Sequence, residues 1–299
     1  MGALEELRAY FSRAPEVCAV YLYGRYPPGP TYPDTDIELG LVFPPGTPED
    51  DISAFLERLG EDNPLGPAQG VLMPSVLNQH VLPVVYEMLG WGQLLVENDR
   101  DAHARFLRES QARIEAAREK LLEEAREVLQ QARRLGEGVP EFRPRPGQPL
   151  RMLDPLRVGW RLGRLLASVA VIEVATRDVE ETARDPERVN QVVGWFNNGA
   201  GAATGIAKAM LTTYELERPP RRWQVFLPLA DLGLVSTEHA LWLGAVVETR
   251  WNLMTTDSLG SPERALLLLR TYLHALVQFA RVASWVTEIP AVGEAARLH

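Results

Sequence analysis

The hydrophobic pattern of the chain changes once, near Asp101, and this change limits its fold more than any other feature. Before Asp101, apolar and polar residues alternate in short runs such as Asp36–Phe43, which is typical of half-buried strands. After Asp101, apolar residues recur every three or four positions, as on helices with one buried face. We therefore expect an α+β domain with a small mixed sheet and helices, followed by an all-α helical bundle.

The first hundred residues predict the elements of the mixed domain. Helices are expected at 5–13, at 48–59 and early in 82–98, and strands at 17–23, 36–43 and 70–77. Between the first two strands lies a turn full of Pro and Gly. We place this domain at residues 1–102.

A long amphipathic helix is predicted from His103 to Leu135, and the Pro- and Gly-rich residues 136–149 end it. We interpret 103–149 as a connecting helix and linker, and 150–299 as the helical bundle. Five helices are expected from Pro155 onward, two of them marked by an N-cap before proline at Asp185 and Ser261.

Composition limits the class of protein. With 46% hydrophobic and 24% charged residues, the chain has the composition of a soluble globular protein. No apolar run approaches the roughly 18 residues of a membrane span, and the acidic N-terminus lacks the features of a signal peptide. We expect a cytoplasmic protein that does not bind membranes. Cys18 is the single cysteine, so no internal disulfide can form, and the five histidines lack the spacing of a zinc site.

Two acidic residues suggest a candidate metal site. Asp36 and Glu38 lie two positions apart on a predicted strand, so both side chains leave the same face while Ile37 and Leu39 enter the core. Paired carboxylates suit Mg²⁺, which binds through one or two carboxylates and substrate phosphates. The alternative is the polar, solvated face of an ordinary strand.

The context of these acids resembles the minimal nucleotidyltransferases (MNT) of the polymerase-β-like superfamily. Their motif is a strand ending in Gly-Ser, a short Gly-containing segment, and then Ser-Asp-Ile-Asp-Leu. In the stretch YLYGRYPPGPTYPDTDIELGLVF, Gly24, Thr35, Asp36, Ile37 and Leu39 match it. The resemblance covers roughly residues 15–110. It implies nucleotide binding by Gly24, Arg25 and Thr35, metal binding by Asp36 and Glu38, and ATP or another nucleotide with Mg²⁺ as cofactors.

Three departures from the family motif concern the same site. Arg25 replaces the serine that faces the triphosphate, and three prolines follow it within five residues. Glu38 replaces the second metal aspartate with a longer acid, which octahedral Mg²⁺ tolerates poorly. The third carboxylate of the family has no counterpart in the segment VLMPSVLN, 71–78. We interpret the site as weakly active or inactive.

The helical half resembles HEPN proteins, which are commonly encoded beside or fused to minimal nucleotidyltransferases. The resemblance spans about 150–287 and rests on segment order, including the exit ELERPPRRWQVF and the helix ending AVVETRWNLMTTDSL. Active members carry Arg, four residues, His, one residue and Tyr. Arg250 matches the arginine, but Thr255 and Asp257 replace the histidine and tyrosine. Because threonine cannot exchange a proton near neutral pH, RNA cleavage is not expected. A structural Arg250, bordering a packed interface, is the alternative.

Two further features have competing interpretations. The spacing of Gly199, Gly201 and Gly205 is similar to a dinucleotide-binding motif, but no predicted strand precedes these glycines. We therefore expect them to let a neighbouring helix approach closely. The only basic patch contains six arginines: Arg143, Arg145, Arg151, Arg157, Arg161 and Arg164. It could contact RNA or an acidic surface of the same chain, and the net charge of −9 favours the second.

These observations predict an MNT–HEPN fusion of toxin–antitoxin descent. Its expected function is non-catalytic or weakly catalytic, in nucleotide binding, assembly or regulation, and the HEPN resemblance implies a homodimer. One alternative is an active Mg²⁺-dependent nucleotidyltransferase that uses Asp36 and Glu38 for adenylyl transfer and the helical domain for substrate binding. The other is an RNA-binding protein that uses Arg250 and the arginine patch.

Overall fold

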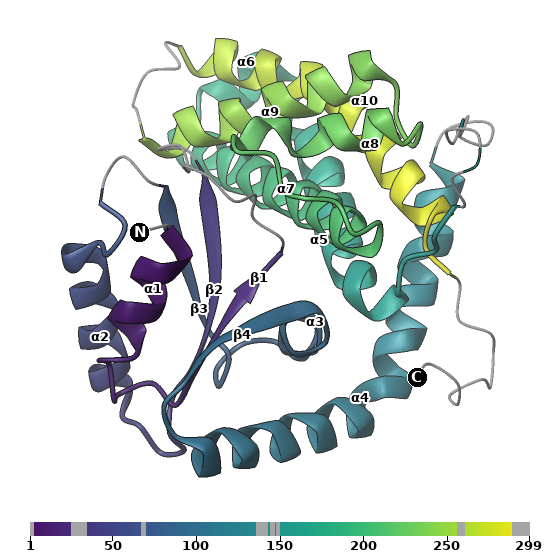
Figure 1. The fold of residues 1–299 in the computed structure, drawn as a ribbon. Helices are drawn as coiled ribbons and strands as arrows, with labels where there is room; N and C mark the ends of the chain where they lie inside the picture. The colour runs from purple at the N-terminus through teal and green to yellow at the C-terminus, as the bar shows by residue number, and fades with distance from the viewer. Residues whose placement is uncertain are drawn as a thin grey trace. The chain divides into compact units, whose positions relative to one another are not determined.

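A computed structural model of the chain describes residues 3–24, 35–66, 70–135, 143, 147, 150–255 and 261–288. The fold class predicted from the sequence is confirmed: a mixed four-stranded sheet with helices precedes a mainly helical region (Figure 1). The chain divides into two compact units. The first contains Met1–Glu119 together with Glu217–Arg222, and the second contains Lys120–Leu216 and Trp223–His299.

The sheet of the first unit has the strand order β3-β2-β1-β4. Its strands are β1 (Ala19–Tyr23), β2 (Asp36–Val42), β3 (Val71–Val76) and β4 (Gly92–Glu97). The central strand β1 pairs antiparallel with β2 and β4, whereas β2 and β3 are parallel. All three predicted strands are present, and β4 follows the helix predicted early in 82–98.

Helices cover both faces of this sheet (Figure 1). On one face, α1 (Ala3–Phe11) and α2 (Glu49–Asp62) pack against the β2 residues Ile37 and Leu39, which are at most 1% exposed. On the other, α3 (Leu82–Trp91) and the start of α4 (Arg100–Arg134) cover β1. Because side chains alternate along β2, Asp36 and Glu38 leave the sheet on the α3 face.

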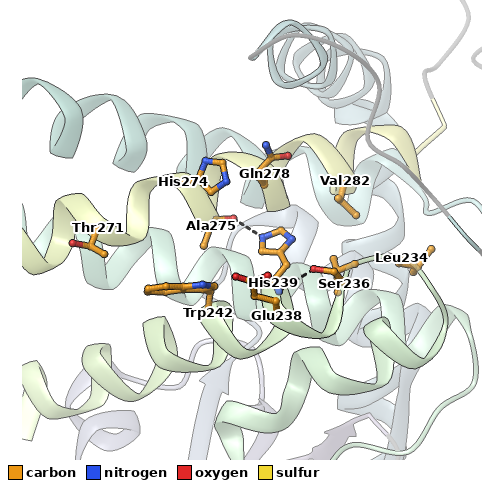
Figure 2. Close-up of a pocket in the computed structure, with 11 residues that line it drawn as sticks. Leu234, Ser236, Glu238, His239, Trp242, Thr271, His274, Ala275, Gln278 and Val282 are labelled. Atoms are coloured by element: carbon orange, nitrogen blue, oxygen red, sulfur yellow. Dashed lines mark hydrogen bonds between the residues drawn. The ribbon is translucent and has the colours of Figure 1, made fainter.

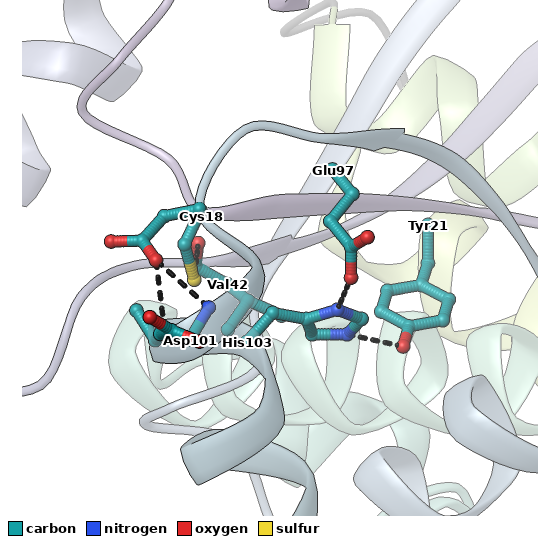
Figure 3. A network of polar contacts seen from close by, with 8 residues as sticks. Cys18, Tyr21, Val42, Glu97, Asp101 and His103 are labelled. Atoms are coloured by element: carbon teal, nitrogen blue, oxygen red, sulfur yellow. Dashed lines mark hydrogen bonds and ion pairs between the residues drawn. The ribbon is translucent and has the colours of Figure 1, made fainter.

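A buried polar network joins β1, β4 and α4 (Figure 3). His103, 3% exposed, contacts the Tyr21 hydroxyl through Nε2 and Glu97 Oε1 through Nδ1, each at 2.7 Å. Burial raises the pKa of Tyr21 to about 12, and that of the nearby Cys18 thiol to about 11. Both groups are therefore neutral in the folded chain near neutral pH. Cys18, directly before β1, is fully buried.

The helical region contains more helices than the five predicted. Six α-helices and one 3₁₀ helix occur in the described residues after 150: α5 (Pro155–Ala175), α6 (Val179–Ala183), α7 (Pro186–Thr213), η1 (Arg222–Phe226), α8 (Leu227–Asp231), α9 (Thr237–Thr255) and α10 (Pro262–Trp285). The sequence missed the five-residue helices because so few residues show no helical period.

The predicted helix starts are confirmed. Asp185 accepts hydrogen bonds from the backbone N–H groups of Glu187 and Arg188, and Ser261 accepts one from Arg264. Each satisfies N–H groups that have no partner within the helix. The apolar faces of these helices then form one core around α5, α7 and α10.

The glycines of α7 lie at close helix contacts, as the sequence predicted. A Cβ atom at Gly199 would lie 2.7 Å from Ser168 Cβ of α5, and one at Gly205 would lie 2.5 Å from Arg161 Nε. Residues 197–205 therefore form helix and not a dinucleotide-binding loop.

Helix α10 is the one helix in the described ranges that is long and apolar enough to cross a membrane. Of its most apolar 18 residues, 56% are buried. Because it packs against α5, α7 and α9 in the core, burial within the protein accounts for its apolar character.

Two glycine substitutions in α7 test this packing. Gly194→Ala adds a methyl group to open space and should raise the free energy of unfolding by about 0.5–1 kcal/mol, because alanine favours helix. Gly199→Ala gains the same propensity but collides with Ser168, and such overpacking costs typically about 1–3 kcal/mol. Urea unfolding should therefore show opposite shifts of the midpoint. Equal shifts would contradict the close α5–α7 contact.

Candidate functional site

The two acids of β2 lie where the sequence predicted them, at the start of the strand. Their backbones pair with Val71 and Met73 of β3, which fixes both side chains on one face. The Asp36 side chain is 17% exposed and the Glu38 side chain 27% exposed. Neither carboxylate therefore belongs to an ordinary solvated strand face.

Two arginines from a distant part of the sequence contact these acids. They belong to residues Glu217–Arg222, here called the arginine segment, which groups with the sheet although its neighbours in sequence belong to the helical unit. Arg218 Nη2 donates a hydrogen bond of 2.9 Å to Glu38 Oε2. Arg222 Nη2 lies 3.5 Å from Asp36 Oδ1. The two arginine side chains are only 6% and 5% exposed, so these are buried ion pairs.

The arginine segment also contacts the residues expected to bind nucleotide. The Thr35 hydroxyl donates a hydrogen bond to the Pro220 carbonyl. Gly24 has a φ of +93°, which favours glycine, and a Cβ atom there would lie 2.2 Å from Arg218 Nε. Gly24 therefore leaves the space that the Arg218 guanidinium fills. Arg25, the third expected nucleotide-binding residue, lies outside the described residues.

Tyr23 and Glu87 support Arg218 from the α3 side. The guanidinium carbon of Arg218 lies 5.0 Å from the centre of the Tyr23 ring, which is cation–π geometry. The Tyr23 hydroxyl donates a hydrogen bond to Glu87, which is 2% exposed. Contacts thus run without interruption from Glu87 through Tyr23 and Arg218 to Glu38.

Sequence reasoning identified the acids but missed Arg218, Arg222, Tyr23 and Glu87. A signal for Glu87 exists, since it is the only acid in the apolar helix LPVVYEMLGW. Arg218 and Arg222 flank a Pro-Pro-Arg sequence, which marks an extended basic segment. No pattern relates that segment to β2, because 180 residues separate Arg218 from Glu38.

The residues present do not fit a two-metal centre. The two acids are paired with two guanidinium groups, so a divalent cation would have to displace charges that already compensate them. Strand β3 contributes no acid, as the sequence indicated. Among the described residues, no group of three or more His, Cys, Asp or Glu side chains could hold a metal ion.

Arg250 lies at a helix contact. It is half-buried on α9, and a Cβ atom at Gly201 of α7 would lie 3.5 Å from its guanidinium carbon. This agrees with an arginine bordering a packed interface. Thr255, at the expected histidine position, is the last residue of α9, and Asp257 lies outside the described residues.

The arginine patch does not form one continuous basic surface. Arg157 is 1% exposed, with Nη1 donating to the Thr213 hydroxyl. Arg151 pairs with Glu215, and Arg164 donates to Asn198. Arg145 lies outside the described residues. Several arginines of the patch therefore bind groups within the helical unit.

No family model matches the chain, and neither a curated protein nor a solved structure shows significant similarity to it.

Removing Arg218 should destabilise the sheet unit, because Glu38 would keep a charge without its guanidinium partner. We expect Arg218→Met to lower the free energy of unfolding by roughly 2–3 kcal/mol, below the 3–5 kcal/mol of a fully buried pair, since Glu38 is partly hydrated. Adding Glu38→Gln should recover part of that loss. Arg221→Met, in the same segment but exposed, is the matched control. Equal effects of Arg218→Met and Arg221→Met in urea unfolding would contradict a stabilising ion pair.

Proposed function

We propose that this chain is an MNT–HEPN fusion of toxin–antitoxin descent in which the nucleotidyltransferase-like half is non-catalytic. In this proposal the acid pair Asp36 and Glu38 holds the arginine segment in place of metal and nucleotide. The single observation that carries it is the pairing of both acids with Arg218 and Arg222. The mixed sheet with its acids at the start of β2 supports the likeness to nucleotidyltransferases.

The chemistry explains why these contacts oppose catalysis. Two-metal phosphoryl transfer needs cations that bridge carboxylates and phosphates and neutralise the developing charge. A guanidinium can neutralise a carboxylate, but it presents only N–H donors and no open coordination position. The same segment contacts Gly24 and Thr35, so a triphosphate would also have to displace Pro220 and Arg218.

A regulatory or assembly role fits this arrangement better than nucleotide binding at the acid pair. Residues that bind nucleotide in the resembled family are used here to bind a segment of the same chain. The ion pairs, the cation–π contact and the Thr35 hydrogen bond together fix that segment. We therefore expect the sheet unit to serve as the binding site for the arginine segment of the same chain.

The alternative, an active Mg²⁺-dependent nucleotidyltransferase, requires both arginines to leave the acids. RNA binding by the arginine patch is less favoured, because Arg157 is buried and the net charge is −9. Should RNA bind, its affinity ought to fall steeply with salt. A flat salt response would remove the RNA-binding alternative.

A transfer assay separates the non-catalytic proposal from the enzyme. The chain is incubated with each of four labelled nucleoside triphosphates and Mg²⁺, with itself and RNA as acceptors. We expect no labelled product above that of Asp36→Ala, because the acids are paired with arginine.

The assay is repeated with the double variant Arg218→Met and Arg222→Met. A product that depends on Asp36, from the wild type or from this variant, would contradict a non-catalytic site. Product from the double variant only would identify the arginine segment as an inhibitor of an intact enzyme.

The homodimer implied by the HEPN resemblance is part of the proposal. Exposed apolar side chains suited to an interface occur on α9 and α10, with Leu241 and Leu267 both 51% exposed. Light scattering should give twice the chain mass of 33.4 kDa. Combining Leu241→Glu with Leu267→Glu should give the monomer mass if α9 and α10 form the interface. A wild-type chain with the monomer mass would contradict the proposed homodimer.

A further inference from the structure

A pocket lies between α9 and α10 within the helical unit (Figure 2). Its volume is about 490 Å³, within the range of small-molecule sites. Its polar and aromatic lining comes from facing stripes of the two helices, with Glu238, His239 and Trp242 from α9 and Thr271, His274 and Gln278 from α10. Leu234, Val235, Ala275 and Val282 supply apolar lining.

The sequence of α9 brings three of these side chains together. Glu238 and Trp242 are four residues apart and His239 and Trp242 are three apart, so all three lie on one face of the helix. Ser236 caps α9 by accepting a hydrogen bond from the His239 backbone N–H. This cap fixes the first turns of α9, which line the pocket.

His239 has a defined tautomer in this pocket. Its Nε2 lies 2.9 Å from the Ala275 carbonyl oxygen, which can only accept, so Nε2 carries the proton (Figure 2). Burial, with the nearby His274, lowers the pKa of His239 and keeps the ring neutral at neutral pH. Nδ1 then has a lone pair, and within the described chain no hydrogen bond to it is formed. The pocket therefore contains an acceptor on a half-buried ring.

Trp242 offers an aromatic surface at the edge of the same pocket. It is 44% exposed, and its ring packs edge-to-face with Tyr272, with centroids 6.2 Å apart. Tyr272 is itself fixed, since its hydroxyl lies 3.0 Å from the Thr249 hydroxyl. A fixed and accessible indole is well suited to a flat or cationic group.

The charges of the lining select among ligand classes. Glu238 is the one acidic side chain of the lining, and no Lys or Arg lines the pocket. An anion would therefore meet a carboxylate without a compensating cation. A metal ion is not supported either, because the described residues form no cluster of three ligands.

We propose that this pocket binds a small organic cation with an apolar body, its ammonium group near Glu238 and its body against Trp242 and the apolar lining. Cation–π attraction to the indole and hydrogen bonds to Glu238 and His239 Nδ1 account for the selectivity, whereas the Gln278 side-chain oxygen already accepts a hydrogen bond from Arg281. The proposal is independent of the acid pair.

Three ligands of nearly equal size test the charge selectivity on the full chain: phenethylamine, 2-phenylethanol and phenylacetate. Titrations followed by calorimetry and by Trp fluorescence should show saturable binding of the amine. The alcohol should bind roughly tenfold more weakly and the acid more weakly still, as expected when one charge contact is lost or reversed. Equal affinities for the three ligands, or no saturable binding of the amine, would overturn the proposal.

Variants then locate the site. Glu238→Gln, at an exposed position, should keep the fold and weaken amine binding roughly two- to fivefold, while leaving the alcohol unchanged. Trp242→Leu should weaken both ligands and remove the fluorescence change. Glu248→Gln, on the same helix but outside the pocket lining, is the matched control. If neither Glu238→Gln nor Trp242→Leu weakens amine binding, the amine binds elsewhere on the chain. That result would refute the assignment of the amine to this pocket.

Discussion

The buried ion pair between Arg218 and Glu38 is the interaction on which the candidate site depends. Its guanidinium also lies over the Tyr23 ring and fills the space beside Gly24. Partly buried carboxylates need such compensation, since removing charge from water costs several kcal/mol per ion. Once Arg218 occupies this position, Pro220 and Arg222 follow within four residues and reach Thr35 and Asp36. One short segment therefore contacts the four described residues expected to bind nucleotide or metal: Gly24, Thr35, Asp36 and Glu38.

This arrangement changes how the departures from the motif are understood. A longer acid at position 38 is unfavourable for octahedral Mg²⁺, but its extra methylene lets a carboxylate reach a guanidinium. The glycine that in the resembled family lies beside phosphate here lies beside Arg218. Under the proposed function, Glu38 and Gly24 thus both serve the contact with the arginine segment, and the hairpin can persist without the reaction.

In the helical unit, small residues and the faces of the helices determine how the helices pack against one another. Gly199 and Gly205 let α7 approach α5, and Gly201 gives room to Arg250. Arg157 and Arg250, which looked like RNA-binding candidates in the sequence, lie at these helix contacts. Between α9 and α10, Glu238, His239 and Trp242 share one helical face and line a pocket.

The sequence by itself determined the fold class, the strands before residue 80, the caps at Asp185 and Ser261 and the shared face of Asp36 and Glu38. These features depend on residues close in sequence, whose alternation or helical period is directly readable. Only the tertiary structure decided that Arg218 and Arg222 reach the acids, that Glu87 supports Tyr23, and that His239 and His274 line one pocket. Contacts across 180 residues depend on how separate elements pack, and no local pattern in the sequence records that packing.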